Sequence, residues 1–416
     1  MLDEKSNNYL LSLYRSEEFW GISFVDVSTG EFLISQLHYD KLIDELTRIN
    51  PSEIIVDETI AETESKVIDV INKRLGAYVT PYHSWAYDRE TSYKRLLRHF
   101  KVHSLEGYGC ADMPHGICAA GALITYLSDT QKNALQHINK IQTYYIDKYM
   151  VLDFYTRRNL ELVETMRSKQ KKGSLLWLMD KTNTAMGGRL IKNWVQQPLT
   201  SKSEIDKRLD AVDELTQNQY LMEQLKENLS LVYDLERLMG KICYGNANAR
   251  DLISLRESVK ILPEIKSLLG NCSSELLHGI HNDLDSLEDI YSLIDRSIID
   301  NPPVTIKEGN IIKDGFDEQL TKYRKALREG KNWIASLELK EKEKTGIKNL
   351  KVGFNKVFGY YIEITKSYLD QVPDHYIRKQ TLVNSERYII PELKEVEDNI
   401  IGAEEKSILL EYELFT

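Results

Sequence analysis

The 416-residue sequence contains few residues that interrupt helices and few cysteines. With 21 glycines and 9 prolines, it permits long helices over most of its length. Its four cysteines, Cys110, Cys118, Cys243 and Cys272, include no CxxC pair, which favours a reducing compartment without disulfides. No stretch approaches 18 apolar residues, and the first residues have neither a signal core nor a transit pattern. We therefore expect a soluble, cytoplasmic protein.

The short motifs of common active sites are also missing. There is no GxxxxGK[ST] loop, no GxGxxG after a strand, no HExxH and no GxSxG. We therefore expect no enzymatic activity and no cofactor in this chain. His278 and His281 lie near Cys272, but a second ligand pair is lacking, so a solvated helix face is a better interpretation than a metal site.

Charge and hydrophobic content indicate a helix-rich protein of several domains. Hydrophobic residues make up 42% of the chain and charged residues 28%, which is sufficient for two to four separate cores. The net charge is −10, so any binding to phosphate groups must come from a local basic patch.

Two segments near the C-terminus show the 3.5-residue period of helices that pack along a seam. The outgoing seam is formed by Phe316, Leu320, Tyr323, Leu327, Ile334 and Leu337, and the returning seam by Leu393, Val396, Ile400, Ala403, Leu410 and Leu414. Between them, residues 350–390 are rich in Tyr, Ile, Val and Phe with Gly and Asn, which is typical of strands and turns. The pattern predicts an antiparallel helical arm, about 40 Å long, with a small β module at its tip.

The expected β module reverses the charge of the protein. Residues 347–390 contain seven Lys or Arg residues against four Asp or Glu residues. Guanidinium, ammonium, hydroxyl and amide donors are mixed around Arg378 and Arg387, and such a mixture suits phosphate oxygens without reading a base sequence. The alternative is that these charges only solvate the module and protect its strand edges.

The first 100 residues predict a mixed α/β domain. Apolar runs at 8–14, 19–27 and 31–37 indicate an antiparallel meander, and helices then alternate with strands at 53–57 and 77–81. This order is that of a ribonuclease H-like fold. A nuclease would need converging carboxylates and a metal ion; the first strand has none, and Asp26 and Asp57 at the ends of later strands are better interpreted as turn or cap residues.

A linker at 111–116 is expected to lead into a mostly helical body. Gly187 and Gly188 lie within a helical pattern, where glycine usually indicates close packing against another backbone. Arg157 and Arg158 are consecutive on a helix, so their side chains diverge, and internal ion pairs are expected rather than a ligand site.

Five long segments, in this order, resemble those of the bacterial MutS family of DNA mismatch recognition proteins. They are TRRNLEL (156–162), NTAMGGRLIKNWVQQPL (183–199), DLERLMGKICYGNANARDL (234–252), KVGFNKVFGYYIEIT (351–365) and RKQTLVNSERYIIPELKEVED (378–398). The resemblance implies a multidomain, mainly α chain with an N-terminal ribonuclease H-like α/β domain. The implied parts are a connector (1–110), a helical core (111–315), an outgoing lever helix (316–346), a β clamp (347–390) and the start of a returning lever helix (391–416).

The resemblance further implies that the clamp contacts the duplex backbone and that the levers link it to an ATPase. The residues that match this role are Asn355, Lys356, Arg378, Lys379, Thr381, Asn384 and Arg387. Implied partners are double-stranded DNA, a MutL-like protein at the connector and a second copy in the full-length family, which uses ATP and Mg. The mismatch-reading and ATPase domains of the family are expected to lie outside this chain. Phe316-Asp317-Glu318 spells the Phe-x-Glu motif of the mismatch-reading domain, but it lies inside the lever seam and is not expected to have that role.

Overall fold

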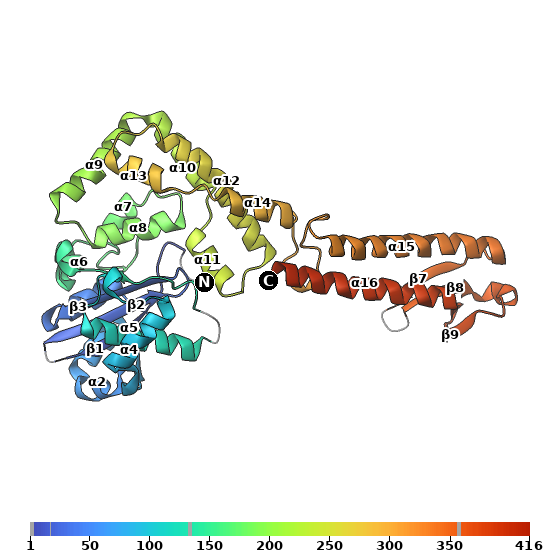
Figure 1. The fold of residues 1–416 in the computed structure, drawn as a ribbon, viewed down its shortest axis with the longest axis horizontal. Helices are drawn as coiled ribbons and strands as arrows, with labels where there is room; N and C mark the ends of the chain where they lie inside the picture. Colours follow the sequence, from blue (N-terminus) through green and yellow to red (C-terminus); the bar gives the residue numbers. More distant parts are fainter. Residues whose placement is uncertain (1–3, 17, 132–134, 356–358) are drawn as a thin grey trace. The chain divides into compact units, whose positions relative to one another are not determined.

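A six-stranded mixed sheet forms the N-terminal part of the chain in the computed structural model, which describes residues 4–16, 18–131, 135–355 and 359–416 (Figure 1). The strands are β1 (Tyr9–Arg15), β2 (Phe19–Asp26), β3 (Glu31–His38), β4 (Glu53–Asp57), β5 (Tyr78–Tyr82) and β6 (Gln142–Thr143). Their order is β5-β4-β1-β2-β3-β6. The first three form the expected antiparallel meander, and β4 pairs parallel with both β1 and β5.

Helices cover both faces of this sheet because its strands bury side chains on both sides. On one face, Ile55 and Phe32 pack with residues of α4 (Arg89–Phe100) and α5 (Pro114–Thr130). On the other, Ile54 and Val56 pack with α1 (Leu42–Ile49) and the short helices α2 (Glu58–Thr63) and α3 (Ser65–Val70). A π-helical turn, Ile71–Leu75, continues α3.

The sheet domain extends beyond the expected boundary at residue 110, and the linker expected at 111–116 is wrong. Helix α5 begins at Pro114 and crosses strands β1, β2 and β3. It approaches β2 so closely that a side chain on Gly21 would overlap the carbonyl group of His115. Strand β6 then pairs with β3. The apolar side chains of α5 are therefore part of the core of the sheet and not the first helix of the helical body.

Most of the chain after β6 is helical, as expected. The helices are α6 (Phe154–Asn159), α7 (Leu175–Met179), α8 (Ala185–Gln196), α9 (Lys202–Gln217), α10 (Gln219–Ser230), α11 (Leu235–Cys243), α12 (Ala249–Leu269), α13 (Glu275–Asp283) and α14 (Glu288–Ser297). Short 3-10 turns occupy Tyr39–Lys41, Ser84–Tyr87, Glu106–Tyr108, Ile146–Lys148, Ile306–Glu308 and Lys366–Gln371. Contacts divide the chain into two units, Met1–Ala247 with Ser254–Tyr291, and Asn248–Ile253 with Ser292–Thr416.

Two long helices form the arm of the second unit. They are α15 (Glu318–Thr345) and α16 (Pro391–Phe415). They run antiparallel, since Arg324 pairs with Glu411 whereas Gly330, farther along α15, packs against Ile400. Asp317 caps α15 through a 2.8 Å hydrogen bond from the Leu320 backbone N–H, which fixes where the helix begins.

The tip of the arm carries a four-stranded antiparallel sheet, which we call the tip sheet. Its strands are β7 (Lys351–Asn355), β8 (Gly359–Thr365), β9 (Ile377–Thr381) and β10 (Ser385–Ile389), in the order β7-β8-β10-β9. Ile362, Ile364 and Tyr388 pack against Leu337 and Leu393 of the arm helices. The expected mainly α, multidomain chain with an N-terminal α/β sheet and a small antiparallel sheet near its C-terminus is confirmed.

Carboxylates of the arm helices join the tip sheet to these helices. Glu338 accepts a 3.0 Å hydrogen bond from the Val352 backbone N–H, and Glu397 accepts one of 3.1 Å from Tyr360. Glu341, which is 1% exposed, accepts a 2.8 Å bond from the hydroxyl of Tyr376. Since each carboxylate satisfies a donor of the sheet, the sheet is held in one register on the helices. Among the described helices, none is long and apolar enough to cross a membrane.

Candidate nucleic-acid interface

Strand β9 is one edge of the tip sheet and carries three of the predicted site residues. Arg378, Lys379 and Thr381 are all exposed. The pairing of β9 with β10 shifts at a β-bulge, so that Gln380 pairs with Arg387 but Arg378 pairs with Tyr388. The bulge leaves Lys379 as the extra residue and places Arg378 and Thr381 on the same face of the sheet.

Arg378 is held loosely by a buried carboxylate. Its Nη1 lies 3.4 Å from Glu386 Oε1, whereas the hydroxyl of Tyr388 donates a 2.6 Å hydrogen bond to the other carboxylate oxygen. Burial raises the pKa of Tyr388 to about 12, and its bond to Glu386 acts in the same direction. Because the Arg378 side chain is 62% exposed and its guanidinium forms one long contact among the described residues, most of its five N–H donors face solvent.

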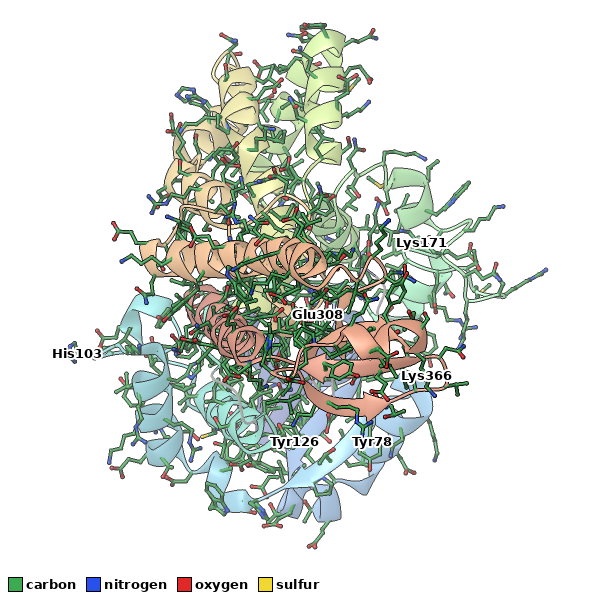
Figure 2. All side chains as sticks on the ribbon, turned by 90° about the vertical axis from the view of Figure 1, so that its right-hand side faces the viewer. Tyr78, His103, Tyr126, Lys171, Glu308 and Lys366 are labelled. Atoms are coloured by element: carbon green, nitrogen blue, oxygen red, sulfur yellow. The ribbon has the colours of Figure 1, made fainter. Side chains whose placement is uncertain are left out.

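The turn after β9 adds further exposed donors. Asn384 is exposed, and its carbonyl oxygen accepts a 3.1 Å hydrogen bond from the backbone N–H of Lys366. Lys366 is itself exposed at this end of the tip sheet (Figure 2). It was not among the predicted site residues, because its position beside Asn384 depends on the pairing of β8 with β10, which are distant in the sequence. Val383, which precedes Asn384, is 86% exposed.

Arg387 lies on the opposite face of the tip sheet from Arg378. Its Nε donates a 3.0 Å hydrogen bond to Glu363, its Nη1 donates one of 2.9 Å to Gln380, and its guanidinium stacks 4.2 Å from the centre of the Tyr361 ring. Glu363 and Gln380 are paired with Arg387 on the two adjacent strands, and Tyr361 lies two residues before Glu363 on β8. Arg387 is therefore integrated into the sheet, and the structure does not bring it together with the exposed donors of β9.

Asn355, another predicted residue, lies at the other end of the tip sheet. It ends β7, pairs with Gly359 at the start of β8 and is partly buried. Strand β8 separates Asn355 from Asn384, and its 7 residues span about 20 Å. The remaining predicted residue, Lys356, lies outside the described residues. The described predicted residues therefore include a cluster at the β9 edge and a separate position at the end of β7.

The cluster, which we call the edge cluster, suits phosphate groups. It consists of Arg378, Lys379, Thr381, Asn384 and Lys366. It combines three cations with a hydroxyl and an amide on a strand edge and an adjoining turn, and phosphate oxygens accept hydrogen bonds from all of these groups. The cations provide affinity but no base-specific contact pattern.

The carboxylates considered for a metal-dependent nuclease lie apart. Asp26 pairs with Tyr9 at the start of β1, whereas Asp57 follows Val56, which pairs with Leu13 near the end of β1. Both have structural partners: Asp26 accepts hydrogen bonds from Ser28 and Asn8, and Asp57 caps α2. Separated by most of the length of a strand, they cannot bind one ion together, so their interpretation as turn and cap residues is confirmed.

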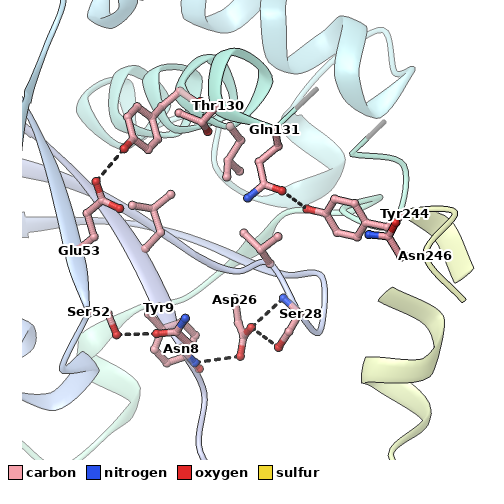
Figure 3. A pocket seen from close by; sticks show the side chains of 14 residues that line it. Asn8, Tyr9, Asp26, Ser28, Ser52, Glu53, Thr130, Gln131, Tyr244 and Asn246 are labelled. Carbon is pink, nitrogen blue, oxygen red and sulfur yellow. Dashed lines mark hydrogen bonds between the residues drawn. The ribbon is translucent and has the colours of Figure 1, made fainter. Parts of the chain in front are cut away.

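A pocket of about 580 Å³ lies beside the N-terminal sheet, and its described lining does not suit phosphate (Figure 3). The lining includes the carboxylates of Asp26 and Glu53. Glu53 accepts a 2.7 Å hydrogen bond from the hydroxyl of Tyr126, and Tyr244 donates one of 3.1 Å to Gln131. The described residues of the lining include two acidic groups and no Lys or Arg, which disfavours anions.

Polar residues of the helical body mostly form internal contacts. Arg157 donates hydrogen bonds to the carbonyl oxygens of Leu152 and Gln196, so it is not part of a ligand site. His281 contacts the carbonyl oxygen of Lys266 at 2.8 Å, and the described residues include no group of three or more His, Cys, Asp or Glu side chains placed to hold a metal ion. Gly188 packs closely against the side chain of Lys5, not against another backbone as expected.

Comparisons with known proteins agree with the arrangement of the arm and the N-terminal sheet. A family model described as MutS domain III matches residues 155–412, and one described as MutS domain II matches residues 8–139. Proteins named DNA mismatch repair protein MutS from Lachnoclostridium phytofermentans and Halothermothrix orenii are each 51% identical to the chain over its whole length. That of Caldanaerobacter subterraneus subsp. tengcongensis is 52% identical.

The chain spans about half the length of these curated relatives, between 44% and 48%. Within it, the two family models together cover both the N-terminal sheet and the arm with its tip sheet. The match to MutS domain III alone accounts for more than half of the residues. This chain therefore belongs to the MutS family.

Proposed function

We propose that this chain is the part of a MutS-like DNA mismatch repair protein that holds duplex DNA by its backbone. The tip sheet acts as the clamp, and the edge cluster supplies its phosphate contacts. The observation that carries the proposal is the gathering of exposed cationic and polar donors on β9 and its turn in a protein whose net charge is −10. Such a local reversal attracts a polyanion to this site and not to the rest of the surface.

The geometry favours contact with the backbone over base readout. The donors of the edge cluster come from one strand edge and one turn, and no helix or two-stranded ribbon in it is shaped to enter a major groove. Asn355 provides a second contact point at the far end of β8, and Arg387 acts chiefly by stabilising the sheet that carries the donors.

The other regions take the roles that the MutS family suggests. The N-terminal domain is a ribonuclease H-like connector, supported by the order β5-β4-β1-β2-β3 with an antiparallel meander followed by parallel strands. It meets a MutL-like partner. The helices α15 and α16 are levers that transmit movement between the clamp and an ATPase that needs ATP and Mg, in a cytoplasmic homodimer.

The proposed domain boundaries are the outgoing lever at 316–346, the clamp at 347–390 and the returning lever from 391. The connector is extended to include α5 and β6.

Fluorescence anisotropy with a labelled duplex of about 30 base pairs at low salt tests the proposal. The double variant Arg378→Glu/Lys379→Glu reverses two exposed charges on β9 and should weaken binding at least about tenfold, since each lost phosphate contact also becomes a repulsion. The matched control is Lys331→Glu/Lys340→Glu, which makes the same change in charge at exposed positions of α15. This control should bind nearly as the unchanged chain does.

Equal loss of binding in both double variants would mean that net charge alone governs affinity, and the edge cluster would not be the site. Unchanged binding in the β9 variant would favour a purely structural role for the tip sheet. Circular dichroism melts of both variants establish that the sheet remains folded, which is expected because all four positions are exposed.

A further inference from the structure

Helix α7 in the first unit exposes nearly all of its large apolar side chains. Its sequence is LLWLM, and Leu176 alone is buried, in a cluster with Leu162 and Val195. Leu178 is 62% exposed, and Leu175, Trp177 and Met179 are exposed as well. Scattered apolar side chains at a surface need no explanation, but four exposed ones on five consecutive residues, spread over the side of the helix away from Leu176, are a concentration that favours an interaction site.

A basic loop lies alongside this helix. Residues 165–173 contain four cations and no acid, and all from Met166 to Gly173 are exposed. Lys171 reaches along α7 and forms a 2.7 Å ion pair with Asp180, which follows the last residue of the helix (Figure 2). Within the described part of the chain, the side chains of Arg167, Lys169 and Lys172 form no ion pair.

The loop and the helix are held in place by their own hydrogen bonds. The Thr165 backbone N–H donates to the Gln170 carbonyl at 2.9 Å, and the Lys169 N–H donates to the Thr165 carbonyl at 3.0 Å. Ser174 links the two elements, because its hydroxyl donates to the Lys171 carbonyl at 2.7 Å and accepts from the Trp177 N–H at 3.2 Å. The cations and the apolar side chains are thus presented as one surface, which we call the α7 surface.

We propose that the α7 surface is a docking site for a protein segment that is both acidic and apolar, such as an amphipathic helix with Leu and Glu side chains. The apolar residues of α7 would cover the Leu side chains of the partner. Arg167, Lys169 and Lys172 would meet its carboxylates. Charge complementarity identifies the occupant, because a neutral apolar segment would leave three unpaired cations beside the contact.

Nucleic acid fits the same surface less well. Binding to single strands without sequence preference relies on aromatic platforms for successive bases, and Trp177 is the one aromatic side chain of the α7 surface. Leu175, Leu178, Met179 and Met166 are aliphatic, and methionine in particular adapts to irregular apolar partners. These side chains would remain exposed to water against a phosphate backbone, whereas a Leu-bearing helix covers them.

The test uses the 416-residue chain and a fluorescein-labelled 20-residue peptide with Leu at i, i+3, i+4 and i+7 spacing and Glu at most other positions. Fluorescence anisotropy should show binding that falls at least about fivefold in Leu178→Ser and in Arg167→Glu/Lys169→Glu/Lys172→Glu, since each change removes one half of the complementarity. The matched control for the charge reversal is Lys101→Glu/Lys140→Glu/Lys260→Glu, at exposed lysines of the same unit, which should bind like the unchanged chain.

Two further probes separate the alternatives. A peptide with Ser in place of every Leu and a peptide with Gln in place of every Glu should both bind at least about fivefold more weakly. The proposal is overturned if the Ser peptide binds equally well, if oligo(dT) of the same length binds more tightly than the Leu and Glu peptide, or if Leu178→Ser has no effect. Leu178 is exposed, so its replacement should leave the thermal melt unchanged, and loss of binding then reports the surface itself.

Discussion

Arg378 and Arg387 lie on opposite faces of the tip sheet because a β-bulge intervenes between their strands. Regular pairing would place Arg378 opposite Ile389 and on the same face as Arg387, but the shift after Arg387 pairs Arg378 with Tyr388 instead. One arginine is therefore exposed beside Glu386, and the other is enclosed by Glu363, Gln380 and Tyr361. We therefore propose that Arg378 serves binding on one face, whereas Arg387 stabilises the sheet on the other.

Replacing each arginine by alanine should separate these two roles. Arg378→Ala should weaken duplex binding severalfold and leave the melting temperature nearly unchanged, because its contact with Glu386 is long and Tyr388 still donates a hydrogen bond to that carboxylate. Arg387→Ala should destabilise the tip sheet by about 1–3 kcal/mol, since it removes charge-assisted hydrogen bonds and leaves Glu363 without its charged partner. Anisotropy and thermal unfolding of both variants measure the two effects. Equal destabilisation by both changes would contradict the assignment.

The helical body has an ion-pair centre on Arg189, a residue that the sequence analysis did not single out. Arg189 is 4% exposed and donates to both oxygens of Asp234, at 2.8 and 2.7 Å, to Glu236 and to the carbonyl oxygen of Glu4. Arg189→Ala should destabilise the first unit by about 2–3 kcal/mol, because these acceptors lose a buried, charged donor. Arg189→Lys should recover only part of this loss, since an ammonium group cannot reproduce the two parallel bonds. Urea unfolding followed by circular dichroism measures both, and full recovery by lysine would contradict the role of the bidentate geometry.

The attachment of the tip sheet to the arm should weaken in acid. A hydrogen bond from Lys342 and another from the Val352 backbone N–H hold the pKa of Glu338 below its usual range. Such a group stabilises the fold above its unfolded pKa of about 4.3, and this stability is lost as the pH falls through the folded pKa. The melting temperature of the arm should therefore fall below about pH 4.3, and less steeply in Glu338→Gln. Identical pH profiles for the two chains would show that this carboxylate does not couple the sheet to the helix.

Helix α5 should be inseparable from the N-terminal sheet. Gly21→Ala places a methyl group against the carbonyl of His115, so it should destabilise the first unit by about 1–3 kcal/mol through forced separation of α5 from β2. Gly107→Ala is the matched control, because nothing lies within 4 Å of the added carbon. Thermal unfolding compares the two, and equal melting temperatures would contradict the close approach of α5 to the sheet.

Local patterns predict much of this fold. The seam of 3.5-residue period requires a second helix with the same pattern, and the loss of that period after Leu350 indicates strands, so the arm and its tip sheet follow from the sequence. The position of α5 in the core of the sheet differs from the expected one, because an apolar stripe is equally typical of a helix in a bundle. Buried residues surround most of its circumference, and such a helix is typical of a position between a sheet and another helix.

The remaining features depend on long-range contacts that periodicity does not encode. No local pattern distinguishes Glu338 and Glu397, which bind backbone N–H groups of the tip sheet, from the solvated glutamates around them. The β-bulge is equally hidden, because Arg378 and Arg387 both follow the alternation expected of a regular strand. Sequence reasoning therefore named four of the five residues of the edge cluster but could not place Arg378 and Arg387 on different faces of the sheet.

The salt dependence of duplex binding tests the central claim most directly. If the edge cluster neutralises about three phosphates, log K should fall with log salt concentration at a slope near −3, equally for duplexes of unrelated sequence. Arg378→Glu/Lys379→Glu should reduce the magnitude of this slope to about 1. An unchanged slope in that variant, or binding that depends on the duplex sequence and not on salt, would contradict the assignment of the edge cluster as a DNA backbone site.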